Sequence, residues 1–160
     1  PELVAGIQET VLAHSEILGV HDLVVHDYGP GHIMATLHAE VSIDADMGHT
    51  HDVIDNVERE LHQKFRVLTT IHMDPIVTND ARVNALREEM LAIAQGLDER
   101  ITLHDFRMTE GPTHINLIFD VVVPRDCPLS DEEVRKEMAS RAKESDPKYI
   151  TVVQVDHPYA

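Results

Sequence analysis

Histidine and carboxylate side chains gather on one predicted sheet face of this chain. His38 lies in an alternating segment, residues 32–43, and His72 and Asp74 lie one pleat apart in a second alternating segment that begins at Val67. Imidazole nitrogens and carboxylate oxygens that converge on an exposed sheet surface are typical ligands of a borderline divalent cation such as zinc. The sequence therefore predicts a metal site on this face.

Two more histidines are expected to reach the rim of the same face. His21 stands at the start of a strand over residues 20–27, and His51 stands at the start of a helix over residues 49–65. The chain has 12 histidines in 160 residues. Those that no spacing gathers into a group are interpreted as surface imidazoles: His14, His26 and His62.

Both alternating segments separate an apolar face from a polar one. One face, expected to be the core side, carries Ile33, Ala35, Leu37, Ala39 and Val41 in the first segment, and Val67, Thr69, Ile71 and Met73 in the second. The other face carries His32, Met34, Thr36, His38 and Glu40, and Leu68, Thr70, His72 and Asp74. We expect the first set to form a core, and we expect Pro75 to end the ladder of the second strand.

The elements around these strands follow from apolar periodicity and turn residues. We expect a helix over 3–18, ended by Gly19, and then strands over 20–27 and 32–43, a helix over 49–65 and a strand over 67–73. The order repeats as a helix over 81–97 capped by Asp80, strands over 101–108 and 113–123, a helix opened by Ser130, and a strand over 148–156. Each half therefore has the order αββαβ.

The repeated order reflects an internal duplication. His21-Asp22 recurs as His104-Asp105, and Gly29-Pro30 with His32 recurs as Gly111-Pro112 with His114. We predict an α+β chain with two tandem units, residues 1–77 and 78–160. Two helices cannot cover both faces of a three-stranded sheet, so we expect both helices of each unit on one face.

The second unit keeps the pattern and loses most of the candidate ligands. Asp120 stands where His38 stood and Gln154 where His72 stood, while His104 and Asp156 persist. A possible second metal site would comprise His104, Asp120 and Asp156. The same face carries Ile118 and Val122, so we expect an apolar interface there in preference to a ligand site.

Composition restricts the function classes. The chain has 29 Asp and Glu against 13 Lys and Arg, a formal charge of −16, which disfavours nucleic acid and anionic membranes and favours cations. Its one cysteine, Cys127, cannot form an internal disulfide, so a reducing compartment is expected. No apolar run approaches the ~20 residues of a membrane-spanning helix, so we expect no membrane insertion of this segment.

Five segments together carry a family resemblance: Gly19-Val20-His21-Asp22-Leu23, Tyr28-Gly29-Pro30-Gly31, Leu37-His38-Ala39-Glu40-Val41, His51-Asp52-Val53-Ile54-Asp55 and Ile71-His72-Met73-Asp74-Pro75. Residues 3–75 resemble the C-terminal cytoplasmic domain of cation diffusion facilitator transporters. The resemblance implies a metallochaperone-like (ferredoxin-like) αββαβ fold, a V-shaped homodimer, and regulation of a transmembrane exchanger by divalent metal bound near the dimer interface. The implied metal ligands are His21, His38, His51, His72 and Asp74.

The resemblance implies a cytoplasmic module without catalytic activity, with zinc as the first candidate metal and iron, manganese, cobalt, nickel and cadmium as alternatives. Its partners would be a second copy of itself and the transmembrane domain of the same transporter. A freestanding metal-binding protein of metallochaperone type remains an alternative. So does a zinc-dependent hydrolase with Glu40 as general base, although no deep apolar pocket is indicated. Asp22, directly after His21, either orients that imidazole or caps a turn.

Overall fold

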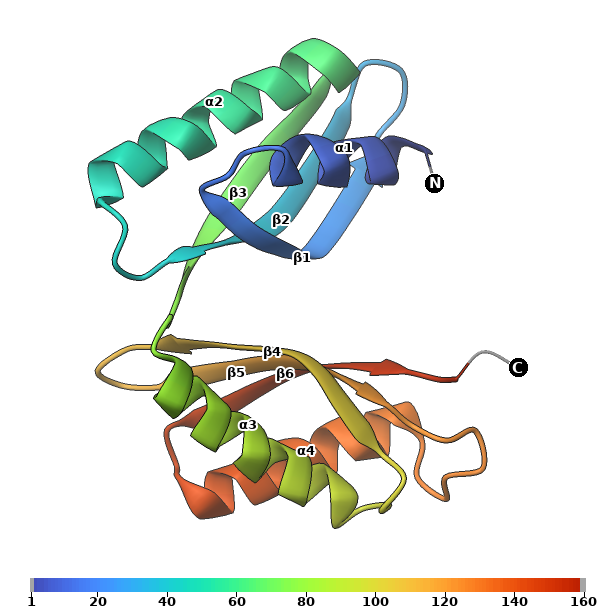
Figure 1. The fold of residues 1–160 in the computed structure, drawn as a ribbon. Helices are drawn as coiled ribbons and strands as arrows, with labels where there is room; N and C mark the ends of the chain where they lie inside the picture. Colours follow the sequence, from blue (N-terminus) through green and yellow to red (C-terminus); the bar gives the residue numbers. More distant parts are fainter. Residues whose placement is uncertain (1, 159–160) are drawn as a thin grey trace. The chain divides into compact units, whose positions relative to one another are not determined.

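The structure is a computed structural model that describes residues 2–158 (Figure 1). The chain divides into two compact units, residues 1–76 and 77–160, called unit 1 and unit 2 below. The sequence analysis expected the boundary after residue 77, one residue later than observed. Each unit contributes three strands and has its own core.

Unit 1 has the predicted order αββαβ. Its elements are α1 (Glu2–Leu12), β1 (Ile17–Asp27), β2 (Ile33–Ser42), α2 (Met47–Phe65) and β3 (Val67–Ile76). β2 lies between the other two strands, antiparallel to β1 and parallel to β3. The parallel pair is connected through α2, as parallel neighbours require a crossover connection.

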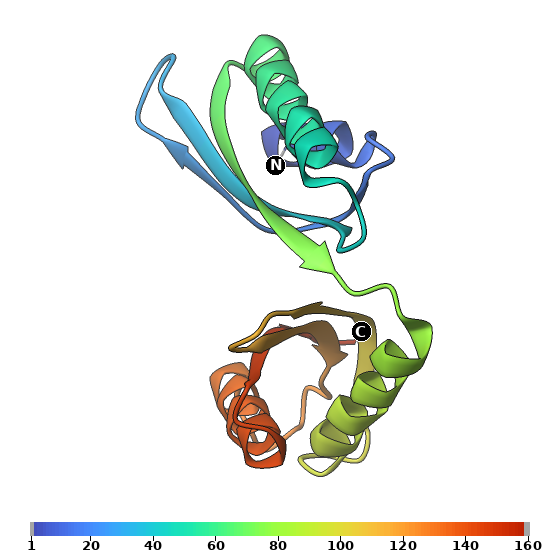
Figure 2. The same ribbon diagram turned by 90° about the vertical axis from the view of Figure 1, so that its left-hand side faces the viewer.

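Both helices of unit 1 cover the same face of the sheet, as expected (Figures 1 and 2). The buried apolar side chains between them and the sheet are Ile7, Val11, Ile17, Ala35, Leu37, Ala39, Val53, Ile54, Val57, Leu61, Val67 and Ile71. The predicted division of the strands is confirmed, because Leu37 and Val67 are buried while Met34, Thr36 and Leu68 on the alternate positions are exposed. The opposite face of β2 and β3 is therefore free to carry polar side chains.

The prediction of a helix over residues 3–18 is wrong at its C-terminal end. α1 stops at Leu12, and a turn with a hydrogen bond from Ile17 N to His14 O (3.0 Å) leads into β1. Ile17 is buried in the same core as Val11, so its position satisfies helical spacing and strand burial alike. Gly19, expected to cap the helix, lies inside β1.

Pro75 does not end β3, contrary to the sequence expectation. The pairing continues from Val41 with Pro75 to Ser42 with Ile76, and Ile43 N donates to Ile76 O at 2.9 Å. In a parallel pair only alternate residues direct their N–H groups at a given neighbour, so a proline at the other positions removes no bond to it.

Unit 2 repeats the arrangement with α3 (Asp80–Gln95), β4 (Thr102–Glu110), β5 (Ile115–Val122), α4 (Asp131–Ser145) and β6 (Tyr149–Asp156). β5 lies between β4 and β6, antiparallel to the first and parallel to the second. The N-cap of α3 is Asn79, whose side chain accepts from Arg82 N, so the assignment of this role to Asp80 was wrong by one residue. Ser130 caps α4 in a complete capping box with Glu133.

The core of unit 2 lies between its helices and its sheet and is larger than that of unit 1. Its buried members include Met90, Leu117, Phe119, Val121 and Met138. Ile118, which lies on the face where an apolar interface was expected, is 5% exposed in the chain. Its burial agrees with a packing role, and the expected interface stays a prediction.

Candidate metal site

Three histidines form one row across the sheet of unit 1. The strand register pairs His21 on β1 with His38 on β2, and His38 with His72 on β3. The rings are adjacent, with centroids 4.9 Å apart for His21 and His38 and 4.7 Å apart for His38 and His72. Parallel pairing of β2 and β3 places Glu40 and Asp74 side by side in the next row.

Asp74 is the carboxylate that contacts all three rings. Its Oδ2 accepts from His38 Nδ1 at 2.8 Å and lies 3.2 Å from His21 Nε2, while its Oδ1 lies 3.3 Å from His72 Nε2. The histidine side chains are increasingly exposed along the row, at 14%, 37% and 67% for His21, His38 and His72. The cluster is thus buried at β1 and open to solvent at β3.

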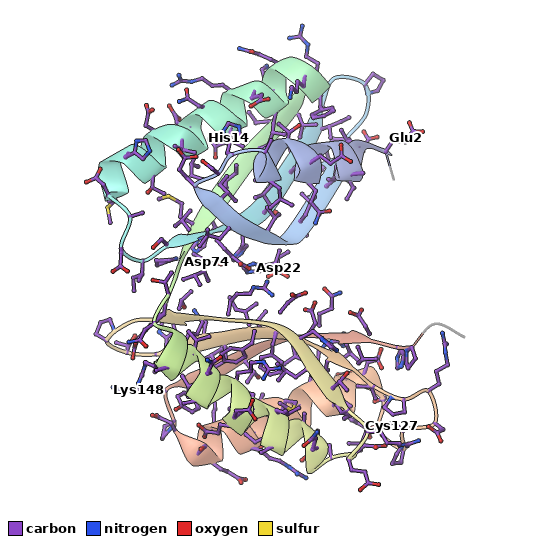
Figure 3. All side chains as sticks on the ribbon, in the orientation of Figure 1. Glu2, His14, Asp22, Asp74, Cys127 and Lys148 are labelled. Carbon is purple, nitrogen blue, oxygen red and sulfur yellow. The ribbon has the colours of Figure 1, made fainter. Side chains whose placement is uncertain are left out.

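The donor atoms fall into two overlapping groups in which all ligand atoms lie within 4.8 Å of one another. One group contains His21, Asp22 and His38, and the other contains His38, His72 and Asp74. Figure 3 labels the two aspartates, Asp22 and Asp74. Asp22 has a positive φ of 51° and lies within the irregularity of the β1–β2 pairing between His21 and Val24.

Glu40 belongs to the site although the sequence did not place it among the ligands. Glu40 is buried, with 2% of the residue's surface exposed. Its Oε1 lies 3.0 Å from His21 Nδ1. Alternation along β2 puts Glu40 on the same face as His38, and this was the available signal. What alternation could not show is that Glu40 reaches across to the ring on β1.

Two carboxylates on one imidazole change its protonation. The hydrogen bond to Asp74 makes the largest contribution and the hydrogen bond to Glu40 the second largest, and together they raise the pKa of His21 to about 9. Burial acts in the opposite direction and lowers this pKa. Burial raises the pKa of Asp74, but the hydrogen bonds from His21 and His38 outweigh it and hold that pKa below its usual value. Without metal, His21 is therefore an imidazolium between two carboxylates at neutral pH.

The donor set fits a divalent cation. Zinc in a tetrahedral site has bonds of ~2.0–2.2 Å to nitrogen and oxygen, so its ligand atoms stand roughly 3.3 Å apart. The ligand atoms of His38, His72 and Asp74 lie within 4.8 Å of one another, which is near that spacing. His21 can join them through Nε2 once that nitrogen has lost its proton.

His51 is the predicted ligand that the structure does not bring to this cluster. It lies exposed near the start of α2 and belongs to neither group of donor atoms found among residues 2–158. Its neighbour His49 lies 3.5 Å from Glu16 Oε1. The helix start was expected to reach the same rim, and within one chain it does not.

Unit 2 has a row of residues at the equivalent positions, but two of the three histidines are replaced. His104, Asp120 and Gln154 are paired in register across β4, β5 and β6. His104 Nε2 is hydrogen-bonded to Thr102 Oγ1 at 3.0 Å, and Gln154 Nε2 donates to Asp156 Oδ1 at 3.2 Å. Burial raises the pKa of Asp120, which opposes the ionised form that a metal would need. Within residues 2–158, no group of three donor atoms comes together in unit 2.

Residues 1–76 match the family model described as the cytoplasmic domain of cation efflux proteins. The curated proteins contain no match. Among residues 2–158, no helix combines the length and apolar character needed to span a membrane.

Solved structures similar to the chain include three whose names refer to transporters. The metal-bound C-terminal domain of the CzcD transporter from Thermotoga maritima is 13% identical with a TM-score of 0.43, covering 46% of this chain and 87% of that one. The putative zinc transporter CzrB in its zinc form is 31% identical with a TM-score of 0.40, covering 46% and 81%. The metal-bound C-terminal domain of CzcD from Cuprividus metallidurans is 22% identical with a TM-score of 0.38, covering 44% and 96%.

Proposed function

Unit 1 of this chain belongs to the family of cation efflux protein cytoplasmic domains, and from this membership we propose that the chain is a metal-sensing regulatory module that binds a divalent cation and dimerises. The family description gives the domain a cytoplasmic location and a transport protein as its setting. Zinc is the first candidate cation. Iron, manganese, cobalt, nickel and cadmium are alternatives with the same donor set.

The observation that carries the proposal is the convergence of His21, His38 and His72 on Asp74. One carboxylate touches three imidazoles, with contacts between 2.8 and 3.3 Å. The proposed ligands are these four residues, and a bound cation would supply the positive charge that this carboxylate-rich site requires. Glu40, next to Asp74, adds a second negative group.

The charge of the chain supports a coupling between metal binding and dimerisation. At −16, two copies repel each other, and cations bound near a shared surface reduce that repulsion. We propose that metal binding strengthens the association of two copies and thereby signals to an attached transporter. Metal binding could strengthen dimerisation in the same way in a freestanding metal-binding protein of this family.

His51 enters the proposal through the second copy. It is exposed and lies outside the donor groups of its own chain, so if it is a ligand, as the family resemblance implies, it must complete the site of another copy. In an equal mixture of His51→Ala and Asp74→Ala chains, random pairing makes half of the dimers heterodimers, and each heterodimer has one intact site. Recovery of zinc affinity on mixing supports the shared site, and no recovery contradicts it.

The hydrolase alternative is disfavoured by the position of Glu40. A general base must reach the proton that it removes, whereas Glu40 is 2% exposed and its Oε1 is bonded to His21. The cluster also lies on an open strand face at its His72 end, where the side chain is 67% exposed. A catalytic zinc site needs a dry, shaped cavity. We therefore propose a binding function and no catalytic one.

Zinc titration of purified protein tests the proposal. The parent should bind zinc, His72→Ala and Asp74→Ala should bind it at least tenfold more weakly, and sedimentation should show more dimer with zinc than without. The matched control is His26→Ala, which removes an exposed histidine of β1 that stacks on Tyr28 and lies outside the cluster. Equal affinity of the Asp74→Ala variant and the parent would refute the site.

A further inference from the structure

The two units differ at a matched pair of positions beside the histidine row. In unit 1 the register pairs Gly19 on β1 with Glu40 on β2, and in unit 2 it pairs Thr102 on β4 with Val122 on β5. Glycine inside a strand has no side chain to pack and weakens the strand. Glycine and glutamate therefore occur together in unit 1, as Gly19 and Glu40, and both are replaced in unit 2.

The glycine makes room for the glutamate. A Cβ placed on Gly19 would lie 2.5 Å from Glu40 Oε2, which is closer than real Cβ contacts. The neighbouring oxygen, Oε1, lies 3.0 Å from His21 Nδ1. A side chain at position 19 would therefore displace the carboxylate from the imidazole.

The histidine of unit 2 shows the alternative arrangement. His104 is exposed, and its Nε2 is bonded to the hydroxyl of Thr102. The same nitrogen of His21 instead lies 3.2 Å from Asp74. The threonine that replaces glycine thus engages the nitrogen that would face a metal.

We propose that Glu40 is a positioning residue for the metal site, which holds His21 with Nδ1–H toward Glu40 and Nε2 toward the cation, and that Gly19 is the residue that permits this contact. The inference rests on the proposed metal-binding function. It concerns the orientation of one ligand, and Glu40 is not itself a ligand in it.

The physical reason is the tautomer of the imidazole. A neutral histidine has one N–H and one lone pair, and the hydrogen bond made by one nitrogen decides which nitrogen can bind the metal. A carboxylate behind the ring also makes the ligand nitrogen more basic, and removal of such partners typically reduces metal affinity roughly 10–100-fold. Because Glu40 is buried, its charge is poorly screened by solvent.

The test measures zinc affinity in a set of variants of the full chain. Glu40→Ala should weaken zinc binding 10- to 100-fold, and Glu40→Gln, whose amide oxygen can still accept from Nδ1–H, should weaken it less. Gly19→Ala should resemble Glu40→Ala, and adding it to Glu40→Ala should have no further effect, since the two act through one contact. The control Gly111→Ala places a Cβ at an ordinary 3.5 Å from His114 O and should leave the affinity unchanged.

A variant that copies unit 2 keeps the test decisive if Glu40→Ala does not fold. Gly19→Thr with Glu40→Val reproduces the pairing of Thr102 and Val122, which packs in unit 2, and it should lose the same affinity. Nitrogen NMR of the zinc-loaded parent should show His21 with its proton on Nδ1, a signature that a purely structural role would not require.

The outcomes separate the inference from the proposed function. If the parent does not bind zinc, the proposed function fails and this inference fails with it. If the parent binds zinc but Glu40→Ala and Glu40→Gln bind it within threefold of the parent, only the inference is overturned. It is also overturned if Gly19→Ala weakens binding equally with and without Glu40.

Discussion

Zinc binding should displace a proton from His21, and this makes the affinity depend on pH well above neutrality. In the metal-free protein His21 has a pKa of about 9, because its ring donates hydrogen bonds to the carboxylates of Asp74, which has the larger effect, and Glu40. The nitrogen that faces Asp74 must lose its proton before it can bind a cation. An ordinary imidazole, with a pKa of ~6.5, would already be neutral at pH 7.5.

The size of the effect follows from the pKa. Well below pH 9 the fraction of neutral His21 falls about tenfold per pH unit, so zinc affinity should rise about 25-fold between pH 7 and 8.5. Binding at pH 7.5 should release close to one proton from this residue.

Calorimetry in buffers of different ionisation enthalpy measures the released protons directly. The control is His21→Gln, which has no imidazolium to deprotonate and should bind zinc more weakly with a flatter profile between pH 7 and 8.5. The reasoning is refuted if the parent releases no proton at pH 7.5. It is also refuted if the parent and the His21→Gln variant have the same pH dependence over that interval.

Three further results are expected. The folded-state pKa of His21 is raised, so its contribution to the stability of the metal-free protein should be complete below pH ~6.5 and should disappear as the pH rises through about 9, as thermal unfolding of the parent and His21→Gln would show. Ser130→Ala removes the capping box of α4 and should cost about 1 kcal/mol in urea unfolding, and a loss below a few tenths of a kcal/mol would contradict it. Asp156→Ala should leave the zinc stoichiometry unchanged, because Asp156 is hydrogen-bonded to Gln154 and, unlike Asp74, not to a cluster of histidines. If metal analysis showed a loss of one equivalent of zinc, unit 2 would hold a second site.

The strand faces of unit 1 could be predicted because burial follows a period of two. Leu37 and His38 are assigned to opposite faces by their positions alone, and the structure confirms this division. The row of three histidines required more, because it depends on the register of β1 against β2. That register contains an irregularity between His21 and Val24, which alternation within a single strand cannot reveal.

The errors in the helix boundaries have a common origin in local ambiguity. Ile17 fits helical spacing and also fits the buried first position of β1, so apolar periodicity could not choose between them. Gly19 was interpreted as a helix cap because a glycine after an apolar run is a common stop signal. Its actual surroundings depend on Glu40, a residue distant in sequence, and only the folded sheet brings the two together.

His51 marks the limit of a prediction made from one chain. Its place near the start of α2 was clear from the sequence, but its distance from the strand histidines depends on how the helix crosses the sheet. The structure leaves it exposed and outside the donor groups of its own chain. Sequence patterns describe the faces of one chain and carry no signal for a ligand supplied by a second copy.

Anomalous diffraction at the zinc absorption edge, from crystals of the full chain grown with zinc, tests the central claim most directly. The account predicts a peak within about 2.0–2.2 Å of donor atoms from His38, His72 and Asp74, with His21 Nε2 as a further ligand. Peaks confined to other places, such as His49 and His51 without Asp74 or the Asp120 region of unit 2, would contradict it.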